Sequence, residues 1–370
     1  MIIGLFTEIL SAGGVQRAGR HVAAVVSKFA AERGLACRFL SLNDPQGLHT
    51  VRVGLSELSV SGYAHSKSQF VLAALSAAGR QPLLAVALHP HLAPVVAVMR
   101  LRSRRFRSIV FAHGIEVWQP LGWPRRLALR CADRVTAPSR DTARHLLSEQ
   151  GIPPEKIRRL AWGLDPEFEA RLRVSVRPPR PLAFPERARI ILTVGRWDPA
   201  ERYKGADTLI SALPHVLQAV PDTVLVLIGD GGDRPRLEQL AREHGIADRT
   251  RFLYGLTQER LFASYAHCDV FALPSSGEGF GLVFLEAMAH GKPVIGGAHG
   301  GIPDVIEDGV TGLLVPHGDI ARLSRALESL LVDPARAGEM GARGRERVQT
   351  AYTFAQFQSR LTQVMEDVLK

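Results

Sequence analysis

Short, almost wholly apolar runs recur along this chain, and segments of helical length separate them. Ile2–Phe6 is the first such run, and Ile190–Val194 opens a second series. A strand that is apolar on both faces must be covered on both faces, as it is in parallel sheets flanked by helices. The alternation therefore predicts an α/β fold. Because 370 residues exceed what one ordinary hydrophobic core holds, we expect two domains.

The individual strands can be predicted from these runs. In the first half they are 2–6, 37–42, 83–88, 108–112 and 134–137, and in the second half 190–194, 224–228, 251–254, 270–273 and 293–295. Helices are expected at 15–31, 282–289 and 354–369. The pattern within 51–63 fits more than one arrangement, and that segment stays open.

A proline-rich segment divides the chain. Residues 171–188 contain Pro178, Pro179, Pro181 and Pro185, and proline at this density prevents regular structure. We therefore predict an N-terminal domain over 1–170, a linker over 171–188 and a C-terminal domain over 189–352.

Basic residues are concentrated in the first part of the chain. Positions 1–180 hold 26 Lys and Arg against 12 Asp and Glu, although the whole chain carries a net charge of only +10. The densest run is Arg100, Arg102, Arg104, Arg105 and Arg107. It is either a solvated helix end or a surface that attracts anionic lipid headgroups. Nucleic acid is not an expected partner, because the run matches no binding module.

Targeting signals are not evident. Met1–Leu10 has no basic start and contains Glu8, so it does not resemble a signal peptide. The most apolar stretch, 83–99, is interrupted by histidines and prolines and is not expected to span a membrane. The three cysteines are odd in number and scattered, which favours a reducing cytoplasm. Peripheral attachment to the inner face of the cytoplasmic membrane is a further hypothesis.

A cationic loop follows the first strand of the second half. Arg196 comes directly after Gly195, and Lys204 directly precedes Gly205. Open parallel sheets bind ligands beyond the carboxyl ends of their strands, where this loop belongs. Arginine can hold phosphate oxygens with two hydrogen bonds, and lysine adds a point charge. Arg196 and Lys204 are therefore candidates for a diphosphate clamp, with two ordinary surface cations as the alternative.

The stretch 274–289 combines glycines with two glutamates. Glu278 precedes Gly279-Phe280-Gly281, and Glu286 lies on the helix expected from Leu282 onward. A helix N-terminus preceded by glycines suits a phosphate, and a carboxylate accepts hydrogen bonds from hydroxyls. Both features together predict a site for a nucleotide-sugar. The alternative is that the glutamates merely cap the helix.

Two further motifs lie in the first half. Gly13 and Gly14 stand between the first strand and its helix, where backbone N–H groups can approach an anion or simply form a tight turn. His113 follows a strand and precedes a glycine, so a functional and a structural role are both open. The glycines do not form GxGxxG, which disfavours a nicotinamide enzyme. No Asp-x-Asp occurs, so no metal site is predicted.

Together, these motifs resemble a known family. GGVQR, AHG, GRW, ERYKG, EGFGLVFLE and DGVTGLLV occur in the order found in the retaining glycosyltransferases of family 4, which have the GT-B architecture. The resemblance implies two Rossmann-like domains with parallel sheets facing a cleft, and a C-terminal helix, 353–370, that packs back on the N-terminal domain. It also implies metal-independent transfer of a hexosyl unit from a UDP- or GDP-sugar to an acceptor hydroxyl.

The resemblance also assigns roles to individual residues. Gly14, beside Gly13, would contact the donor phosphate, Arg196 and Lys204 the diphosphate, and His113 would lie near the transferred sugar. Glu278 would bind sugar hydroxyls beside the backbone of Gly279, Phe280 and Gly281; Leu282 and Val283 would approach the phosphate and ribose, and Glu286 the ribose hydroxyls. The chain departs from the family at Trp162, where an asparagine is usual.

The acceptor is expected to be a glycan or a lipid-linked glycan of the cell envelope or of an exopolysaccharide. Two alternatives stay open: a catalytically silent partner subunit and a nucleotide-sugar epimerase.

Overall fold

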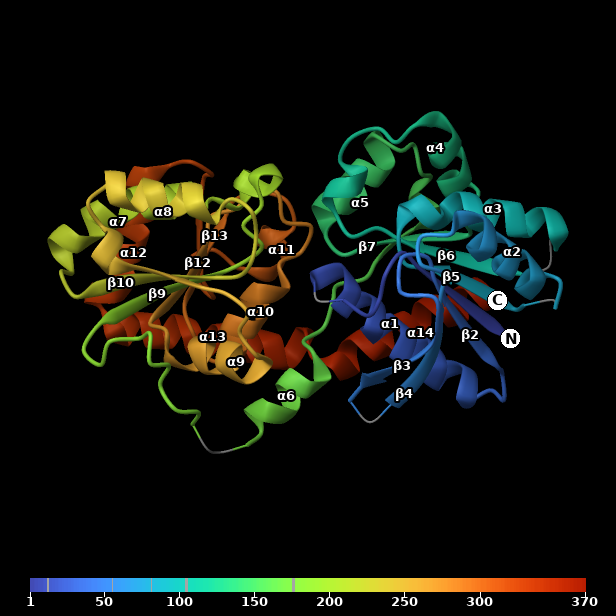
Figure 1. The fold of residues 1–370 in the computed structure, drawn as a ribbon, viewed down its shortest axis with the longest axis horizontal. Coiled ribbons are helices and arrows are strands. Elements are labelled where there is room, and N and C mark those ends of the chain that lie inside the picture. Colours follow the sequence, from blue (N-terminus) through green and yellow to red (C-terminus); the bar gives the residue numbers. More distant parts are fainter. Residues whose placement is uncertain (12, 55, 81, 104–105, 175–176) are drawn as a thin grey trace. The chain divides into compact units, whose positions relative to one another are not determined.

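The chain folds into two compact α/β units (Figure 1). Unit 1 comprises Met1–Glu167 and Thr353–Lys370, and unit 2 comprises Phe168–Tyr352. The structure is a computed structural model, and it describes residues 1–11, 13–54, 56–80, 82–103, 106–174 and 177–370.

A sheet in the order β3-β4-β2-β1-β5-β6-β7-β8 forms the centre of unit 1. Its strands are β1 (Ile2–Phe6), β2 (Cys37–Ser41), β3 (Gly47–Val53), β4 (Ser56–Gly62), β5 (Leu84–Ala87), β6 (Arg107–Phe111), β7 (Arg134–Ala137) and β8 (Ile157–Arg159). All neighbours pair in parallel except β3 and β4, which form an antiparallel hairpin at one edge. Every residue of β1 and of β5 is buried, which explains their wholly apolar sequences.

Helices cover both faces of this sheet. They are α1 (Gly14–Ala31), α2 (Lys67–Ala78), α3 (Ala93–Arg102), α4 (Trp123–Arg130), α5 (Arg140–Ser148) and α14 (Phe354–Leu369), with short 3-10 turns η1 (Pro90–Leu92), η2 (Ile115–Val117) and η3 (Pro154–Lys156). From β1 the chain passes to β2 on one side of β1 in the sheet. It later passes to β5, β6, β7 and β8, which follow one another on the other side. Because such crossovers are right-handed, α1 lies on one face and α2, α3 and α4 on the other. Figure 1 shows this arrangement, with α14 on the face of α1.

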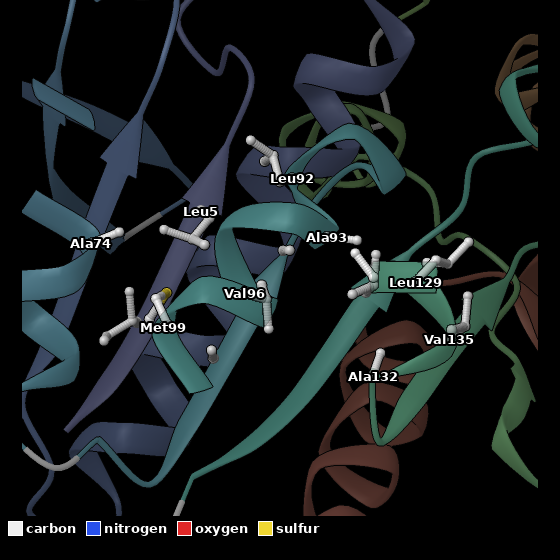
Figure 2. Packing of buried hydrophobic residues seen from close by; sticks show 14 of the residues in the cluster. Leu5, Ala74, Leu92, Ala93, Val96, Met99, Leu129, Ala132 and Val135 are labelled. Carbon is white, nitrogen blue, oxygen red and sulfur yellow. The ribbon is translucent and has the colours of Figure 1, made fainter. Parts of the chain in front are cut away.

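Buried aliphatic side chains fill the space between the sheet and α2 to α4. Leu5 of β1, Ala74 of α2, Val96 and Met99 of α3 and Leu129 of α4 belong to one cluster (Figure 2). Fully burying a leucine, valine or methionine side chain stabilises the fold by roughly 1.5–3 kcal/mol. The cluster therefore fixes the central strands, and with them the loops that follow their carboxyl ends.

Unit 2 is built on a sheet in the order β11-β10-β9-β12-β13-β14, in which every neighbouring pair is parallel. The strands are β9 (Arg189–Val194), β10 (Thr223–Ile228), β11 (Thr250–Leu253), β12 (Val270–Leu273), β13 (Val294–Gly297) and β14 (Leu313–Val315). The helices are α7 (Ala206–Ala219), α8 (Arg234–Glu243), α9 (Gln258–His267), α10 (Leu282–Ala289), α11 (Ile302–Val305), α12 (Ile320–Val332) and α13 (Pro334–Ala351), with η4 (Pro199–Lys204) and η5 (Ala247–Arg249). In Figure 1, α7, α8 and α12 cover one face, and α9, α10 and α13 the other.

The strands and helices predicted from the apolar runs are confirmed, with end points shifted by a few residues at most. The segment left open, 51–63, holds the end of β3 and all of β4. Buried and exposed residues alternate along these two strands, because they form an edge that is covered on one face only. They therefore lack the continuous apolar run that marks the other strands.

The chain passes from unit 1 to unit 2 at Glu167–Phe168, within α6 (Pro166–Leu172) and ahead of the predicted linker. The described part of the proline-rich segment instead packs on unit 2. Phe184 is buried, and Arg180 donates a 2.8 Å hydrogen bond to the carbonyl oxygen of Pro185. His267 Nε2 lies 2.7 Å from the carbonyl oxygen of Pro178. Proline prevents a helix or strand here, but these contacts still fix the segment.

Within the described ranges, no helix has both the length and the apolar character that crossing a membrane requires. Cys37, Cys131 and Cys268 are free thiols.

The C-terminal end of α10 yields a prediction about pH. Burial lowers the pKa of His290 to about 3, and its ring packs against Phe262 and Phe168 at centroid distances of 4.4 and 5.4 Å. An unfolded chain protonates this histidine near pH 6.5, whereas the folded chain does not. Unfolding therefore takes up a proton below that pH, and the free energy of unfolding falls by up to about 1.4 kcal/mol per pH unit.

We expect thermal melting between pH 7.5 and 5.5 to show a larger loss for the wild type than for His290→Phe, which keeps a ring but cannot titrate. Equal losses in the two proteins would contradict a His290 that is held neutral among aromatic rings.

Candidate functional site

The loops after β9 and β12 meet at one edge of the unit 2 sheet. The chain runs from β9 to β10 and β11 on one side and then returns to β12 on the other, so the strand order reverses at β9. Open α/β sheets bind ligands beyond the carboxyl ends of their strands at such a reversal. Arg196 and Lys204 lie in the loop after β9, and Glu278 lies in the loop after β12.

Direct backbone contacts hold these two loops together. Ser276 N donates to the carbonyl oxygen of Tyr203 at 2.9 Å, and the Tyr203 ring covers Gly277, where a Cβ would lie 2.5 Å from it. Gly205 has a φ of +80°, and a Cβ there would lie 2.7 Å from the carbonyl oxygen of Pro274. Only glycine fits this position. The two loops are thus a single assembly within unit 2.

The charged groups of this assembly influence one another. Burial lowers the pKa of the Lys204 ammonium and raises that of the Glu278 carboxyl, and each group partly offsets the shift of the other. The opposing effects follow from an ammonium and a carboxylate close together and away from water. Burial, with Glu278 nearby, also raises the pKa of Tyr203 to about 12. The predicted clamp lysine and the predicted sugar-binding glutamate therefore lie in one site.

Glu201 contacts both cations of the predicted clamp. One of its carboxylate oxygens accepts from Arg196 Nη2, and the other lies 2.8 Å from Lys204 Nζ. The side chains of Glu201 and Lys204 are 12% and 14% exposed, whereas that of Arg196 is 70% exposed. The sequence did not single out Glu201 as a partner of the cations, although it stands three residues before Lys204 in the ERYKG motif.

Helix α10 begins at the same edge. Gly281 is its N-cap residue, with a φ of +93°, and a Cβ there would lie 2.6 Å from the Phe284 ring. No side chain among the described residues caps this helix. Its first backbone N–H groups can therefore serve an anion, because helix N-termini carry positive potential. Leu282 and Val283, the first two helical residues, are partly exposed.

Glu286 lies deeper than the sequence suggested. Its side chain is buried, and Oε2 accepts a 2.7 Å hydrogen bond from the hydroxyl of Tyr265. Tyr265 is fully buried on α9 and stacks on His290 with a centroid distance of 6.2 Å. Glu286 thus joins α10 to α9, and binding to ribose hydroxyls stays a prediction. No pattern in the sequence marks this tyrosine, which lies 21 residues before Glu286.

The second group of predicted residues lies at the carboxyl edge of the unit 1 sheet. The loop that carries Gly13 and Gly14 follows β1, where the strand order reverses. Buried Asp44 accepts from the backbone N–H groups of Ile9 and Leu10 at 2.9 and 3.2 Å. Arg20 donates to the carbonyl oxygen of Ile9 at 2.8 Å. The course of the glycine loop is therefore set by charged groups on both sides of it.

His113 is held on several sides. Nε2 donates a 2.6 Å hydrogen bond to the carbonyl oxygen of Leu88, since a carbonyl can only accept. The ring stacks on Trp162 and His89, with centroid distances of 5.5 and 6.0 Å. Burial lowers the pKa of His89 to about 3, so that ring is neutral at pH 7. The orientation of the His113 ring is thus fixed within unit 1.

Trp162, the departure from the family pattern, is the residue that supports His113. It is 4% exposed and also stacks on Phe111 of β6, 5.9 Å between centroids. Phe357 of α14 also packs against it, with 5.4 Å between the ring centroids. Trp162 therefore has a packing role: the indole fills the space between β6 and the C-terminal helix.

Two arginines of the basic run of unit 1 lie against a carboxylate. Arg100 pairs with Asp133 and donates to the carbonyl oxygen of Cys131 at 2.8 Å. Arg107 Nη1 lies 3.6 Å from the other oxygen of the same carboxylate. Arg104 and Arg105 lie outside the described residues. Asp133 therefore neutralises part of the surface that the sequence suggested for anionic lipids.

Two family models together cover most of the chain. "Glycosyltransferase Family 4" matches residues 16–168, and "Glycosyl transferases group 1" matches residues 178–347. A "GDP-mannose-dependent monoacylated alpha-(1-6)-phosphatidylinositol monomannoside mannosyltransferase" of Corynebacterium glutamicum is 32% identical over 70% of either chain. The chain belongs to glycosyltransferase family 4.

Other relatives agree with this assignment. A "GDP-mannose-dependent alpha-(1-6)-phosphatidylinositol monomannoside mannosyltransferase" of Mycolicibacterium smegmatis is 36% identical, and the match spans 66% of either chain. The structure titled "Sucrose-phosphate synthase (tll1590) from Thermosynechococcus elongatus" superimposes with a TM-score of 0.78 at 23% identity, covering 99% of this chain and 98% of that one. These findings confirm the family resemblance and the architecture of two Rossmann-like domains, and they do not favour the epimerase or the silent subunit.

The site residues predicted from the sequence thus form two groups, each within its own unit. Unit 2 holds Arg196, Lys204, Glu278, Gly279, Phe280, Gly281, Leu282, Val283 and Glu286, and unit 1 holds Gly13, Gly14 and His113. No group of three or more potential metal ligands occurs in the described part of the chain.

The packing of Trp162 leads to a stability prediction. Trp162→Ala should leave a cavity beneath His113 and lower the free energy of unfolding by about 3–5 kcal/mol. Trp162→Phe keeps an aromatic ring and should retain most of that stability. Urea denaturation followed by circular dichroism measures both. An unchanged urea midpoint for the alanine variant would contradict the packing role.

Proposed function

We propose that this chain is a retaining hexosyltransferase that uses a nucleotide diphosphate-sugar donor and a glycolipid acceptor. One observation carries the proposal: Arg196, Lys204 and Glu278 occupy a single assembly of loops at the strand reversal of unit 2, beside the uncapped N-terminus of α10. Two cations and a helix start suit a diphosphate, and a carboxylate suits sugar hydroxyls.

In the proposed reaction the sugar forms no covalent bond with the protein. The bond between the anomeric carbon and the diphosphate oxygen breaks, and a bond from that carbon to the acceptor oxygen forms on the same face. The acceptor proton passes to an oxygen of the departing diphosphate. Negative charge therefore develops on the leaving group, where Arg196, Lys204 and the first amides of α10 stabilise it. Glu278 orients the sugar through its hydroxyls.

The donor we propose first is GDP-mannose, and UDP-sugars are the alternative. The names of the relatives from Mycolicibacterium smegmatis and Corynebacterium glutamicum both specify GDP-mannose. The proposed acceptor is a lipid with an inositol phosphate headgroup or a similar anionic glycolipid, because both names specify a phosphatidylinositol mannoside. The chain spans about two thirds of the length of these relatives.

Thermal melting and transfer assays together test the clamp, Arg196 and Lys204, and the identity of the donor. Thermal melting should rise with GDP-mannose or GDP, because a ligand that binds only the folded state at 100 times its Kd adds about 2.7 kcal/mol to stability. EDTA should not alter the shift. Lys204→Ala should abolish most of the shift and lower transfer by about 10²–10³-fold, since it removes a charge that faces the leaving group.

Lys292→Ala, in the same unit but outside the site, is the matched control and should behave like the wild type. A folded Lys204→Ala protein with unchanged turnover would overturn the clamp. A rise in melting temperature with UDP but not with GDP would show that the donor nucleotide carries uracil rather than guanine.

A lipid acceptor requires contact with a membrane surface, and α4 supports one. Trp123 and Leu127 lie one helical turn apart and are 68% and 47% exposed. Arg125, Arg126 and Arg130 lie on the same short helix, and none of them pairs with a carboxylate among the described residues. Exposed tryptophan and leucine beside arginines suit the headgroup region of an anionic bilayer. We propose α4 as the contact of a cytoplasmic protein with the inner membrane face.

Neutralising the three arginines of α4 to glutamine should weaken binding to phosphatidylserine vesicles by about 100-fold, at roughly 1 kcal/mol for each residue. Co-sedimentation at low salt measures this. The matched control changes three exposed arginines of unit 2, Arg242, Arg325 and Arg343, and should have little effect. Equal losses in the two variants would show that net charge rather than α4 governs attachment.

A further inference from the structure

Glu201 occupies an unusual position for a loop carboxylate. Each of its two oxygens faces a different cation, Arg196 on one side and Lys204 Nζ at 2.8 Å on the other. Such a carboxylate, set between an arginine and a lysine, mimics one end of a diphosphate, which also offers separate oxygens to two cations.

Glu201 has no evident role in shaping the loop itself. Asp198 caps η4 by accepting a 3.0 Å hydrogen bond from the backbone N–H of Ala200. Gly205 ends η4 and provides its close approach to Pro274. Glu201 even departs from helical geometry, with φ −115° and ψ 26°. The position of the Glu201 side chain is therefore explained by its contact with the two cations rather than by a role in holding the loop backbone.

The site holds two cationic and two carboxyl side chains without a ligand. Arg196 and Lys204 lie beside Glu201 and Glu278, and burial raises the pKa of the Glu278 carboxyl. Lys204 is 14% exposed, so its ammonium needs a nearby anion to stay charged. Arg196 is 70% exposed and can change its orientation without leaving a buried group unpaired. An incoming diphosphate would thus find both cations already engaged.

We propose that Glu201 is an internal counter-ion of the clamp, and that the diphosphate of the donor takes its place on Arg196 and Lys204 when it binds. This inference rests on the proposed function. Glu201 acts as a positioning residue: it keeps Lys204 charged and both cations gathered in the empty site. It also weakens binding of the free nucleoside diphosphate, which favours release of that product.

This exchange predicts opposite effects on stability and on affinity. Without ligand, Glu201→Gln should melt at a lower temperature, because Lys204 loses a close anionic partner. The same variant should bind GDP about tenfold more tightly, since the diphosphate no longer competes with a carboxylate. A residue that only supported the loop would lower both quantities. Isothermal titration calorimetry and thermal melting measure them.

Asp198→Asn is the matched control, because it removes one negative charge from the same loop without touching the clamp. It should change the GDP affinity by no more than about twofold, which excludes a general effect of net charge. A similar increase in GDP affinity in Asp198→Asn and Glu201→Gln would overturn the proposed role of Glu201.

Inorganic pyrophosphate separates this inference from the proposed function. If pyrophosphate binds more tightly to Glu201→Gln than to the wild type while neither protein binds GDP or UDP, the exchange stands and the nucleotide donor fails. If GDP binds the wild type but neither GDP nor pyrophosphate binds the variant more tightly, the donor stands and the exchange is overturned.

Discussion

The contact between the loop after β9 and the loop after β12 is the constraint on which the site of unit 2 depends. Gly205 lies against the backbone of Pro274, and Tyr203 bonds to Ser276 and covers Gly277. Any side chain at Gly205 or Gly277 would force the loops apart, and the cations would move away from Glu278. The strand reversal at β9 brings the two loops to one edge, and these glycines close the remaining distance. A parallel sheet and a few small residues therefore suffice to assemble a charged site from Lys204 and Glu278, which are 74 residues apart in the chain.

Once the loops meet, the balance of charge decides what the site can bind. Lys204 and Glu278 both lie where water is scarce, so each shifts the pKa of the other toward the charged form. Glu201 adds a second anion beside the cations. If Glu201 is the internal counter-ion that we propose, a diphosphate enters by exchange with it rather than by filling a bare cationic pocket. The uncapped start of α10 adds positive potential without any charge that needs a counter-ion.

The sequence was sufficient to predict the strands that are buried on both faces, because burial on both faces leaves a continuous apolar run. It was not sufficient for β3 and β4, whose alternating pattern reflects an edge covered on one face only. The motif glycines and cations could likewise be located from their spacing after a strand. Side-chain pairing could not: the contact of Glu286 with Tyr265 and that of Arg100 with Asp133 join residues distant in sequence. Trp162 was recognised as a departure, but its packing on His113 and Phe357 depends on three segments that only the fold brings together.

The two units offer different chemistry at equivalent places in their folds. Both have a glycine loop that leads into a helix beside the strand reversal. Unit 2 adds Arg196 and Lys204 there, whereas Arg20 of unit 1 donates to the carbonyl oxygens of Ile9 and Ser11. In unit 1 the loop after β5 carries His89, which is neutral at pH 7 because burial lowers its pKa to about 3, and the loop after β6 carries His113, whose Nε2 is already committed to Leu88. These groups can orient neutral hydroxyls. On the proposed function, stabilisation of the leaving diphosphate therefore belongs mainly to unit 2, and substitutions of His113 should affect the position of the sugar more than the departure of the leaving group.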